Sequence, residues 1–97
     1  MSYKISVKAA SDLQHIWEYT VQTWSISQAD KYVNAIIDEI EIIAHHPNKG
    51  KDISFLKANY RYCKAMSHLI FYRHTENESE IEIIRILHSR MDWPNSI

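Results

Sequence analysis

The chain has 97 residues, 45% of them hydrophobic and 11% aromatic, which is typical of one globular domain. Its net charge of -1 excludes a generally basic nucleic-acid-binding protein, because phosphate neutralisation supplies most of the affinity in that class. No apolar run approaches the roughly 18 residues of a membrane span, the N-terminus lacks a signal-peptide core, and Cys63 has no second cysteine to pair with. We therefore expect a cytoplasmic protein.

The N-terminal quarter predicts a short strand and a first helix. Residues 3–8 alternate between apolar and polar side chains, as in a half-buried strand. Ser11 and Gln14 have the spacing of an N-terminal capping box, and apolar residues follow at helical intervals as far as Trp24.

A second and longer amphipathic helix follows. Ser27 and Asp30 repeat the capping pattern, and residues 32–44 carry an apolar stripe at helical spacing. Pro47 and Gly50 end this helix and open a loop.

The second half of the chain predicts three strands, at residues 60–66, 68–74 and 81–88, with a polar hairpin turn centred near Asn77. The order is therefore β-α-α-β-β-β. We expect an α+β fold in which a helical hairpin packs on a small antiparallel sheet, as one domain over residues 1–97.

The last hairpin is apolar on both faces. A turn at Asn77 pairs Tyr72 with Glu82 and Ile70 with Ile84, and it brings His88 near Met66. The two faces then carry Leu69, Phe71, Ile81, Ile83 and Leu87 on one side, and Ile70, Tyr72, Ile84 and Ile86 on the other. The helices cover one face, and the other needs a second cover, which suggests a partner chain.

The sequence predicts no metal site and no cofactor. Adjacent His45 and His46 point about 100° apart on a helix. His68 and His74 lie about 20 Å apart along a strand, too far to share one ion. Cys63 fits a small core residue inside a strand.

A group of basic residues allows two interpretations. Arginine, histidine and tyrosine side chains brought together can act as acid, base and phosphate clamp in RNA cleavage. Alternatively, the arginines lie at the rim of the sheet and pair with the acids of residues 76–82. The group comprises Arg61, Arg73, Arg85, His88 and Arg90, with Tyr60, Tyr62 and Tyr72 nearby.

Trp93, in the C-terminal "MDWPNSI", also has two interpretations. Either the tail folds back and Trp93 packs on the sheet, or this aromatic, beside Arg90 and Asp92, anchors a protein interface. The sequence leaves both open.

The element order and the segments "AASDLQHIWEY" and "SHLIFYRH…IEIIRILHSRMD" resemble the ParE/RelE toxins of bacterial type II toxin–antitoxin systems, and the ParE branch in particular. The resemblance spans essentially the whole chain. It implies a toxin neutralised by a co-encoded, ParD-like antitoxin whose C-terminal segment wraps it. ParE-like members poison DNA gyrase by protein binding, whereas RelE-like members cut mRNA on the ribosome.

Two features favour the gyrase-directed branch. RelE-type sequences commonly have an arginine directly after the position matching His68, and here that residue is Leu69. A nuclease that enters the anionic ribosome is also favoured by a strong positive charge, which this chain lacks. The RelE-like ribosome-dependent mRNA endoribonuclease remains the alternative.

The resemblance and the apolar stripes together give candidate surfaces. We expect no catalytic residue, no membrane contact and no specific nucleic-acid binding by the toxin alone. The candidate target-binding residues are His88, Arg90, Met91, Asp92 and Trp93. The candidate antitoxin-binding residues are Leu13, Trp17, Trp24, Ile70, Tyr72, Ile84 and Ile86.

Overall fold

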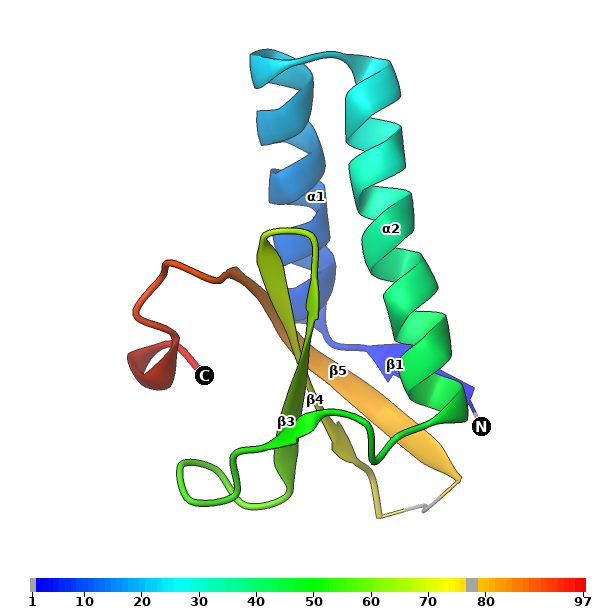
Figure 1. Ribbon diagram of the computed structural model, residues 1–97, viewed down its shortest axis with the longest axis vertical. Helices are drawn as coiled ribbons and strands as arrows, with labels where there is room; N and C mark the ends of the chain where they lie inside the picture. Colours follow the sequence, from blue (N-terminus) through cyan, green and yellow to red (C-terminus); the bar gives the residue numbers. More distant parts are fainter. Residues whose placement is uncertain (1, 77–78) are drawn as a thin grey trace.

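The computed structural model describes residues 2–76 and 79–97 (Figure 1). Its elements are β1 (Ser2–Ile5), α1 (Val7–Thr23), α2 (Ile26–His45), β2 (Lys51–Asp52), β3 (Tyr60–Ala65), β4 (His68–His74), β5 (Glu80–His88) and the 3-10 helix η1 (Trp93–Asn95). They confirm the predicted α+β fold and element order, to which the structure adds the two-residue β2.

The five strands form one sheet in the order β1-β5-β4-β3-β2. Strands β2 to β5 pair antiparallel, but β1 pairs parallel with β5, so the sheet is mixed and not wholly antiparallel as we expected. Parallel neighbours need a long connection, and here the two helices and the other strands supply it.

The register of β4 and β5 differs from our expectation. A bulge at Phe71/Tyr72 shifts the pairing and leaves Ile84 as the extra residue on β5. The observed pairs include His68 with His88, Ile70 with Ile86, Tyr72 with Ile83 and Arg73 with Glu82. Ile81 and Ile83 therefore share the helix-covered face with Ile70 and Tyr72, and not the face of Leu69 and Phe71 as we expected. Asn77, the predicted centre of the turn, lies outside the described residues.

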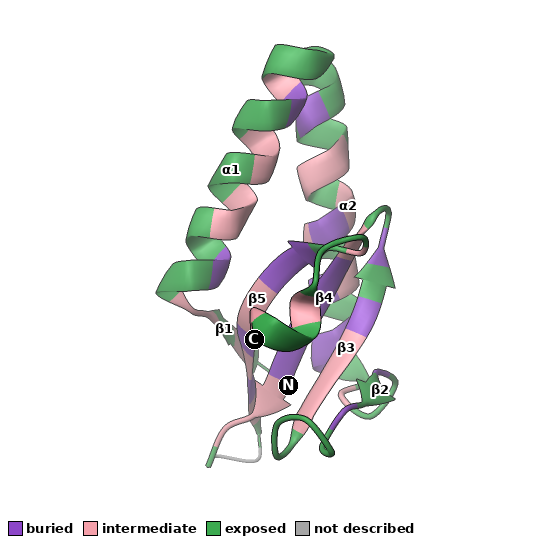
Figure 2. Cartoon of the chain, turned by 90° about the vertical axis from the view of Figure 1, so that its left-hand side faces the viewer, coloured by how far each residue is buried: buried purple, intermediate pink, exposed green. Residues whose placement is uncertain are grey.

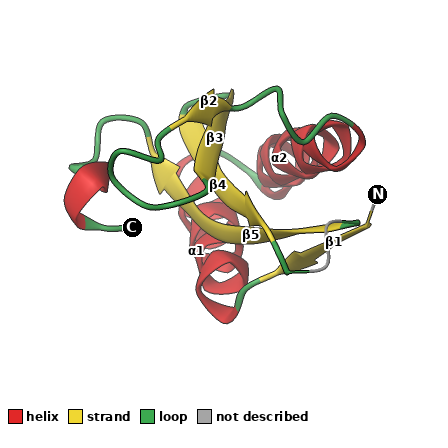
Figure 3. Cartoon of the chain, turned by 90° about the horizontal axis from the view of Figure 1, so that it is seen from below, coloured by secondary structure: helices red, strands yellow, loops and turns green. Residues whose placement is uncertain are grey.

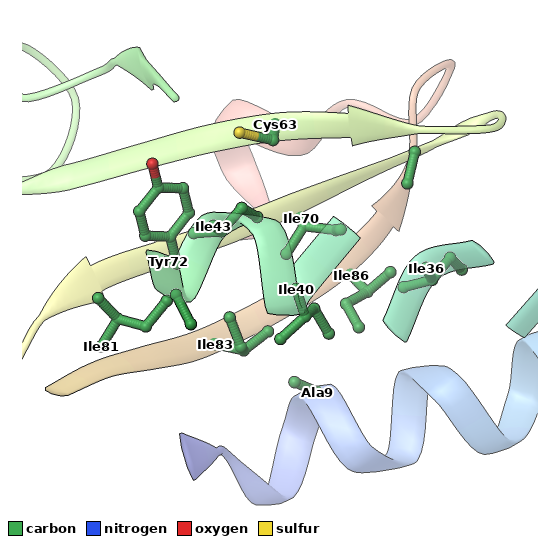
Figure 4. Close-up of a cluster of buried hydrophobic side chains, with 12 residues drawn as sticks. Ala9, Ile36, Ile40, Ile43, Cys63, Ile70, Tyr72, Ile81, Ile83 and Ile86 are labelled. Carbon is green, nitrogen blue, oxygen red and sulfur yellow. The ribbon is translucent and has the colours of Figure 1, made fainter. Parts of the chain in front are cut away.

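The main core lies between the helices and one face of the sheet (Figure 4). Tyr72 and the buried isoleucines of β4 and β5 meet one face of α2, while α1 contributes Ala9. These side chains follow the helical and strand periods of the sequence, which is why periodicity predicts them. The fully buried members include Ile36, Ile40, Ile43, Ile70, Tyr72, Ile81 and Ile83.

The opposite face of the sheet has a small core of its own, which corrects the expectation that a partner must cover it. We call it the open-face core; its buried members are Ile53, Leu69, Phe71 and Leu87, with Tyr60, Tyr62, Trp93 and Ile97 packed against them. The ring centroid of Trp93 lies 5.3 Å from that of Phe71 and 5.4 Å from that of Tyr62. The tail folds back, and η1 crosses in front of the sheet (Figure 2).

Both helices begin before the predicted caps. Ser6 caps α1 by accepting a hydrogen bond from the backbone N–H of Ala9 at 3.0 Å, and Ser25 caps α2 through the N–H of Gln28 at 3.0 Å. The predicted caps Ser11 and Ser27 lie inside the helices. A serine in the extended conformation can satisfy the free N–H groups of a first turn without the full capping-box pattern.

Candidate functional site

An apolar groove of about 540 Å³ lies where the helical hairpin extends past the end of the sheet. Ile16, Tyr19 and Trp24 line it from α1, Tyr32 from α2, and Met66 from the turn between β3 and β4. In Figure 1 both helices rise well above this turn. Most of the surface that lines this groove is apolar.

Large side chains in this groove remain open to solvent. Trp24 is 73% exposed, Tyr19 67% and Met66 57%. Burying one such side chain stabilises a contact by roughly 1.5–3 kcal/mol. An uncovered group of them marks a binding surface more often than an inert one.

Tyr32 fixes the turn that forms one wall of the groove. Its hydroxyl accepts a hydrogen bond from the backbone N–H of Ser67 at 3.1 Å and lies 2.6 Å from Nδ1 of His68. Met66 has a φ of 56°, which is uncommon for a residue with a side chain. The Tyr32 contacts hold this turn conformation in place, and Met66 lines the groove.

Two imidazole rings lie next to each other in the lining of the groove. The rings of His68 and His88 lie 5.1 Å apart, edge to face. Burial lowers the pKa of His68 to about 4, and His88 acts in the same direction while Asp12 opposes it. At neutral pH His68 is therefore uncharged. No Asp, Glu, Lys or Arg among residues 2–76 and 79–97 lines this groove, so its lining is apolar with a few polar groups.

The candidate target-binding residues follow one another in the chain but separate in space. His88 lines the groove, and its Nδ1 accepts a hydrogen bond from the N–H of Arg90 at 3.1 Å, which holds the turn after β5. Asp92 accepts a hydrogen bond from the Asn95 side chain at 2.7 Å. Trp93 packs on the open-face core, as the first of its two interpretations expected. Among these five candidates, Arg90 and Met91 have exposed side chains that neither line the groove nor make a side-chain hydrogen bond to another described residue.

The candidate antitoxin-binding residues divide into two sets. Trp24 lines the groove, and Leu13 and Trp17 are half-buried on α1, where the indole N–H of Trp17 donates to Asp30 at 3.0 Å. The other set offers a partner little surface, because Ile70, Tyr72 and Ile86 are buried in the main core and Ile84 is half-buried at the bulge.

Three of the arginines that could have served RNA chemistry bind within the chain. Arg85 forms a bidentate pair with Asp12, at 2.8 and 3.0 Å. Arg73 donates to Glu82 at 3.0 Å, and Arg61 donates to the carbonyl oxygen of Gly50 at 2.9 Å. The Arg73 contact matches the prediction that the arginines pair with the acids of residues 76–82. These contacts favour a structural role for all three guanidinium groups.

Sequence reasoning missed Tyr19, Met66 and the Asp12–Arg85 pair. Tyr19 lies off the apolar stripe of α1, and Met66 sits in a turn, so neither follows a period. Asp12 and Arg85 are 73 residues apart, and only the fold brings them together.

The described residues show neither a cluster of metal ligands nor a helix that could span a membrane. No three His, Cys, Asp or Glu side chains of residues 2–76 and 79–97 gather as a metal site requires. Neither helix in this part of the chain combines the length and apolarity needed to cross a bilayer.

Comparison with known proteins identifies the family. The model for the ParE toxin of type II toxin-antitoxin system, parDE, matches residues 3–93. This chain belongs to the ParE toxin family. The resemblance to ParE sequences is thereby confirmed over nearly the whole length.

Individual ParE proteins agree with this assignment. The chain is 41% identical to Toxin ParE1 of Caulobacter vibrioides and 36% identical to Toxin ParE1 of Mycobacterium tuberculosis, in each case over 93% of this chain and 91% of the relative. Among solved structures, a chain described as "Chromosomal ParDE TA system from P. aeruginosa" superposes with a TM-score of 0.78 at 26% identity. That superposition covers 91% of this chain and 95% of the other.

Proposed function

We propose that this ParE chain arrests growth by docking on DNA gyrase, without catalysis, in the cytoplasm, and that a cognate ParD-like antitoxin neutralises it by covering the apolar groove. The uncovered groove carries the proposal. An amphipathic helix from a partner, with apolar side chains at helical spacing, fits a trough of this kind. Trp24 and Tyr19 supply the large aromatic surface that dominates such interfaces.

The similar solved chain is described as part of a ParDE system, and this supports an antitoxin partner for the present chain. The part of the chain that the structure describes places no acid, lysine or arginine in the groove lining, so the antitoxin segment that fills it is expected to be apolar on its inner face. Leu13 and Trp17, half-buried on α1, extend the candidate contact along the helix.

Several observations support docking over cleavage. Arg61, Arg73 and Arg85 are engaged within the chain, and a transition-state clamp requires guanidinium groups aimed at the substrate. Leu69 is 6% exposed and belongs to the open-face core, where an apolar residue cannot stabilise a phosphorane. The net charge of -1 gives little attraction to RNA.

The RelE-like endoribonuclease is the alternative, and induction of the chain in cells separates the two. A gyrase-directed toxin arrests growth while translated mRNA stays intact in primer extension. Cuts at codon positions within translated transcripts would reject the proposal in favour of the nuclease.

The antitoxin half of the proposal is tested at Trp24. Trp24→Ala removes an exposed aromatic from the groove, so we expect at least a tenfold loss of affinity for the antitoxin encoded beside this gene, measured by calorimetry. Ile42→Ala is the matched control, because Ile42 is a partly exposed apolar residue of α2 that does not line the groove. Equal affinities for both variants and the parent chain would place the antitoxin elsewhere.

A further inference from the structure

The loop between β2 and β3, residues 53–59, carries a second exposed apolar surface that the groove does not include. Phe55 is 79% exposed and its neighbour Leu56 is 42% exposed. Neither residue belongs to the open-face core. Two large apolar side chains side by side on a loop tip cost solubility, which favours a binding role.

The backbone of this loop is held by its own hydrogen bonds. The N–H groups of Leu56 and Lys57 donate to the carbonyl oxygen of Ile53 at 2.9 and 3.1 Å, and the N–H of Ser54 donates to Asp52 at 2.8 Å. Ile53 is 1% exposed and anchors the loop in the open-face core. Phe55 is therefore presented on an ordered turn, and a contact through it costs little conformational entropy.

The loop lies away from the groove. In Figure 1 it projects at the bottom of the molecule, whereas the groove-forming ends of the helices are at the top. Figure 3 shows the loop and the C-terminal tail on the same side of the sheet, across from α2. Ile53 and Trp93 both pack into the open-face core, so this core supports the loop and the tail together.

The rim of the loop is basic. Lys51 and Lys57 are exposed on either side of Phe55 in the sequence. The one acid of this segment, Asp52, accepts the Ser54 hydrogen bond and lies 3.8 Å from Arg61, so the two exposed lysines leave the segment with a net positive charge. A partner that meets this loop is favoured by an acidic rim.

We propose that the loop of residues 53–59 is a contact surface for the toxin's protein target, with Phe55 and Leu56 entering an apolar pocket that carboxylates surround. This inference rests on the proposed function, because it assigns a surface to the docking step. A rigid aromatic with an aliphatic neighbour and flanking cations matches the composition of an interface centre with a charged rim.

A protein pocket fits these residues better than a nucleic acid does. Leu56 has no π-face to stack on a base, and two lysines neutralise few phosphates. The net charge of -1 adds no long-range attraction to DNA or RNA.

The test compares three forms of the full-length chain expressed at matched levels without antitoxin. They are the parent, the double variant Phe55→Ala with Leu56→Ala, and a control, Val7→Ala, which truncates an 88% exposed residue at the start of α1. We expect the loop variant to lose at least tenfold of its growth inhibition, scored as surviving colonies, and the control to match the parent. Antitoxin affinity is expected to stay within twofold in all three, and unchanged thermal unfolding verifies the fold.

Each other outcome overturns the inference. If the loop variant arrests growth like the parent, the loop does not contact the target. If it loses only antitoxin affinity, the loop is an antitoxin surface. The loop would be assigned to nucleic acid if the parent binds duplex DNA, the double variant Lys51→Glu with Lys57→Glu does not, and the Phe55 and Leu56 variant still does. A parent chain that never arrests growth rejects the proposed function itself and this inference with it.

Discussion

At the residue scale, Gly50 and Tyr72 form a tightly fitted pair. The Tyr72 hydroxyl accepts a hydrogen bond from the Gly50 N–H at 3.0 Å and donates to the carbonyl oxygen of Pro47 at 2.6 Å. Burial raises the pKa of Tyr72 to about 12, so this hydroxyl stays protonated and remains a donor. The pair fixes the chain where it leaves α2 for the sheet.

Gly50→Ala is expected to lower the free energy of unfolding by about 1–3 kcal/mol, the usual cost of overpacking. An added Cβ would meet the Tyr72 hydroxyl and lie 2.8 and 2.9 Å from two ring carbons, with no room to relax inside the core. Urea denaturation measures the change. Lys51→Ala, at the exposed neighbouring position, is the control and should stay within about 0.5 kcal/mol of the parent.

His68 gives a prediction for pH. Its pKa is about 4 in the folded chain, against about 6.5 when unfolded. The unfolded chain therefore takes up the proton first as pH falls, so this contribution to stability is complete above pH 6.5 and is lost between pH 6.5 and 4. His68→Gln should reduce the difference in unfolding free energy between pH 7.5 and pH 5. An unchanged difference would show that His68 is not the half-buried neutral group described above.

At the element scale, the C-terminal tail acts as a cover for the sheet. Trp93 packs on Phe71 and Tyr62, and the carbonyl oxygen of Ser96 accepts a hydrogen bond from Arg85 at 3.3 Å. Since Arg85 also binds Asp12 of α1, one side chain links the tail to the first helix. The tail is therefore part of the fold as well as a candidate contact.

Trp93→Ala is expected to destabilise the chain by about 2 kcal/mol, less than the cost at a fully buried site because Trp93 is half-buried. Met91→Ala, two residues earlier at an exposed position, should change stability by less than about 0.5 kcal/mol. Thermal and urea unfolding of both variants provide the comparison. Equal, small effects would mean that the tail does not stabilise the sheet.

The elements themselves could be predicted from periodicity, but their ends could not. The stripe of α2 is long enough to identify the helix, whereas Ser25 and Ser27 lie two residues apart and only the backbone conformation chooses between them. The predicted register of β4 and β5 was wrong for a related reason. A single-residue bulge at Phe71/Tyr72 reverses which face Ile81 and Ile83 occupy, and no local signal marks it.

At the scale of the whole molecule, the two layers leave different surfaces at opposite ends. The groove needs α1, α2 and the β3–β4 turn at once, so sequence reasoning found Trp24 but not Tyr19 or Met66. The expectation of a partner covering the second sheet face failed because the tail and Ile53 cover it. Packing of this kind depends on contacts between segments far apart in the chain, and hydrophobic periodicity does not predict such contacts.

The proposed docking action depends on the three arginines of the sheet, which are already engaged within the described part of the chain. Arg61, Arg73 and Arg85 stabilise the fold, and the open face of the sheet is filled by Trp93 and Ile97. We propose that a protein arranged in this way acts by occupying a partner and not by breaking a bond.

The most direct test adds the purified full-length chain to DNA gyrase and, in parallel, to ribosomes translating a defined mRNA. We predict that DNA supercoiling falls as the chain concentration rises and that the mRNA remains uncut. Undiminished supercoiling together with mRNA breaks at codon positions would contradict the account.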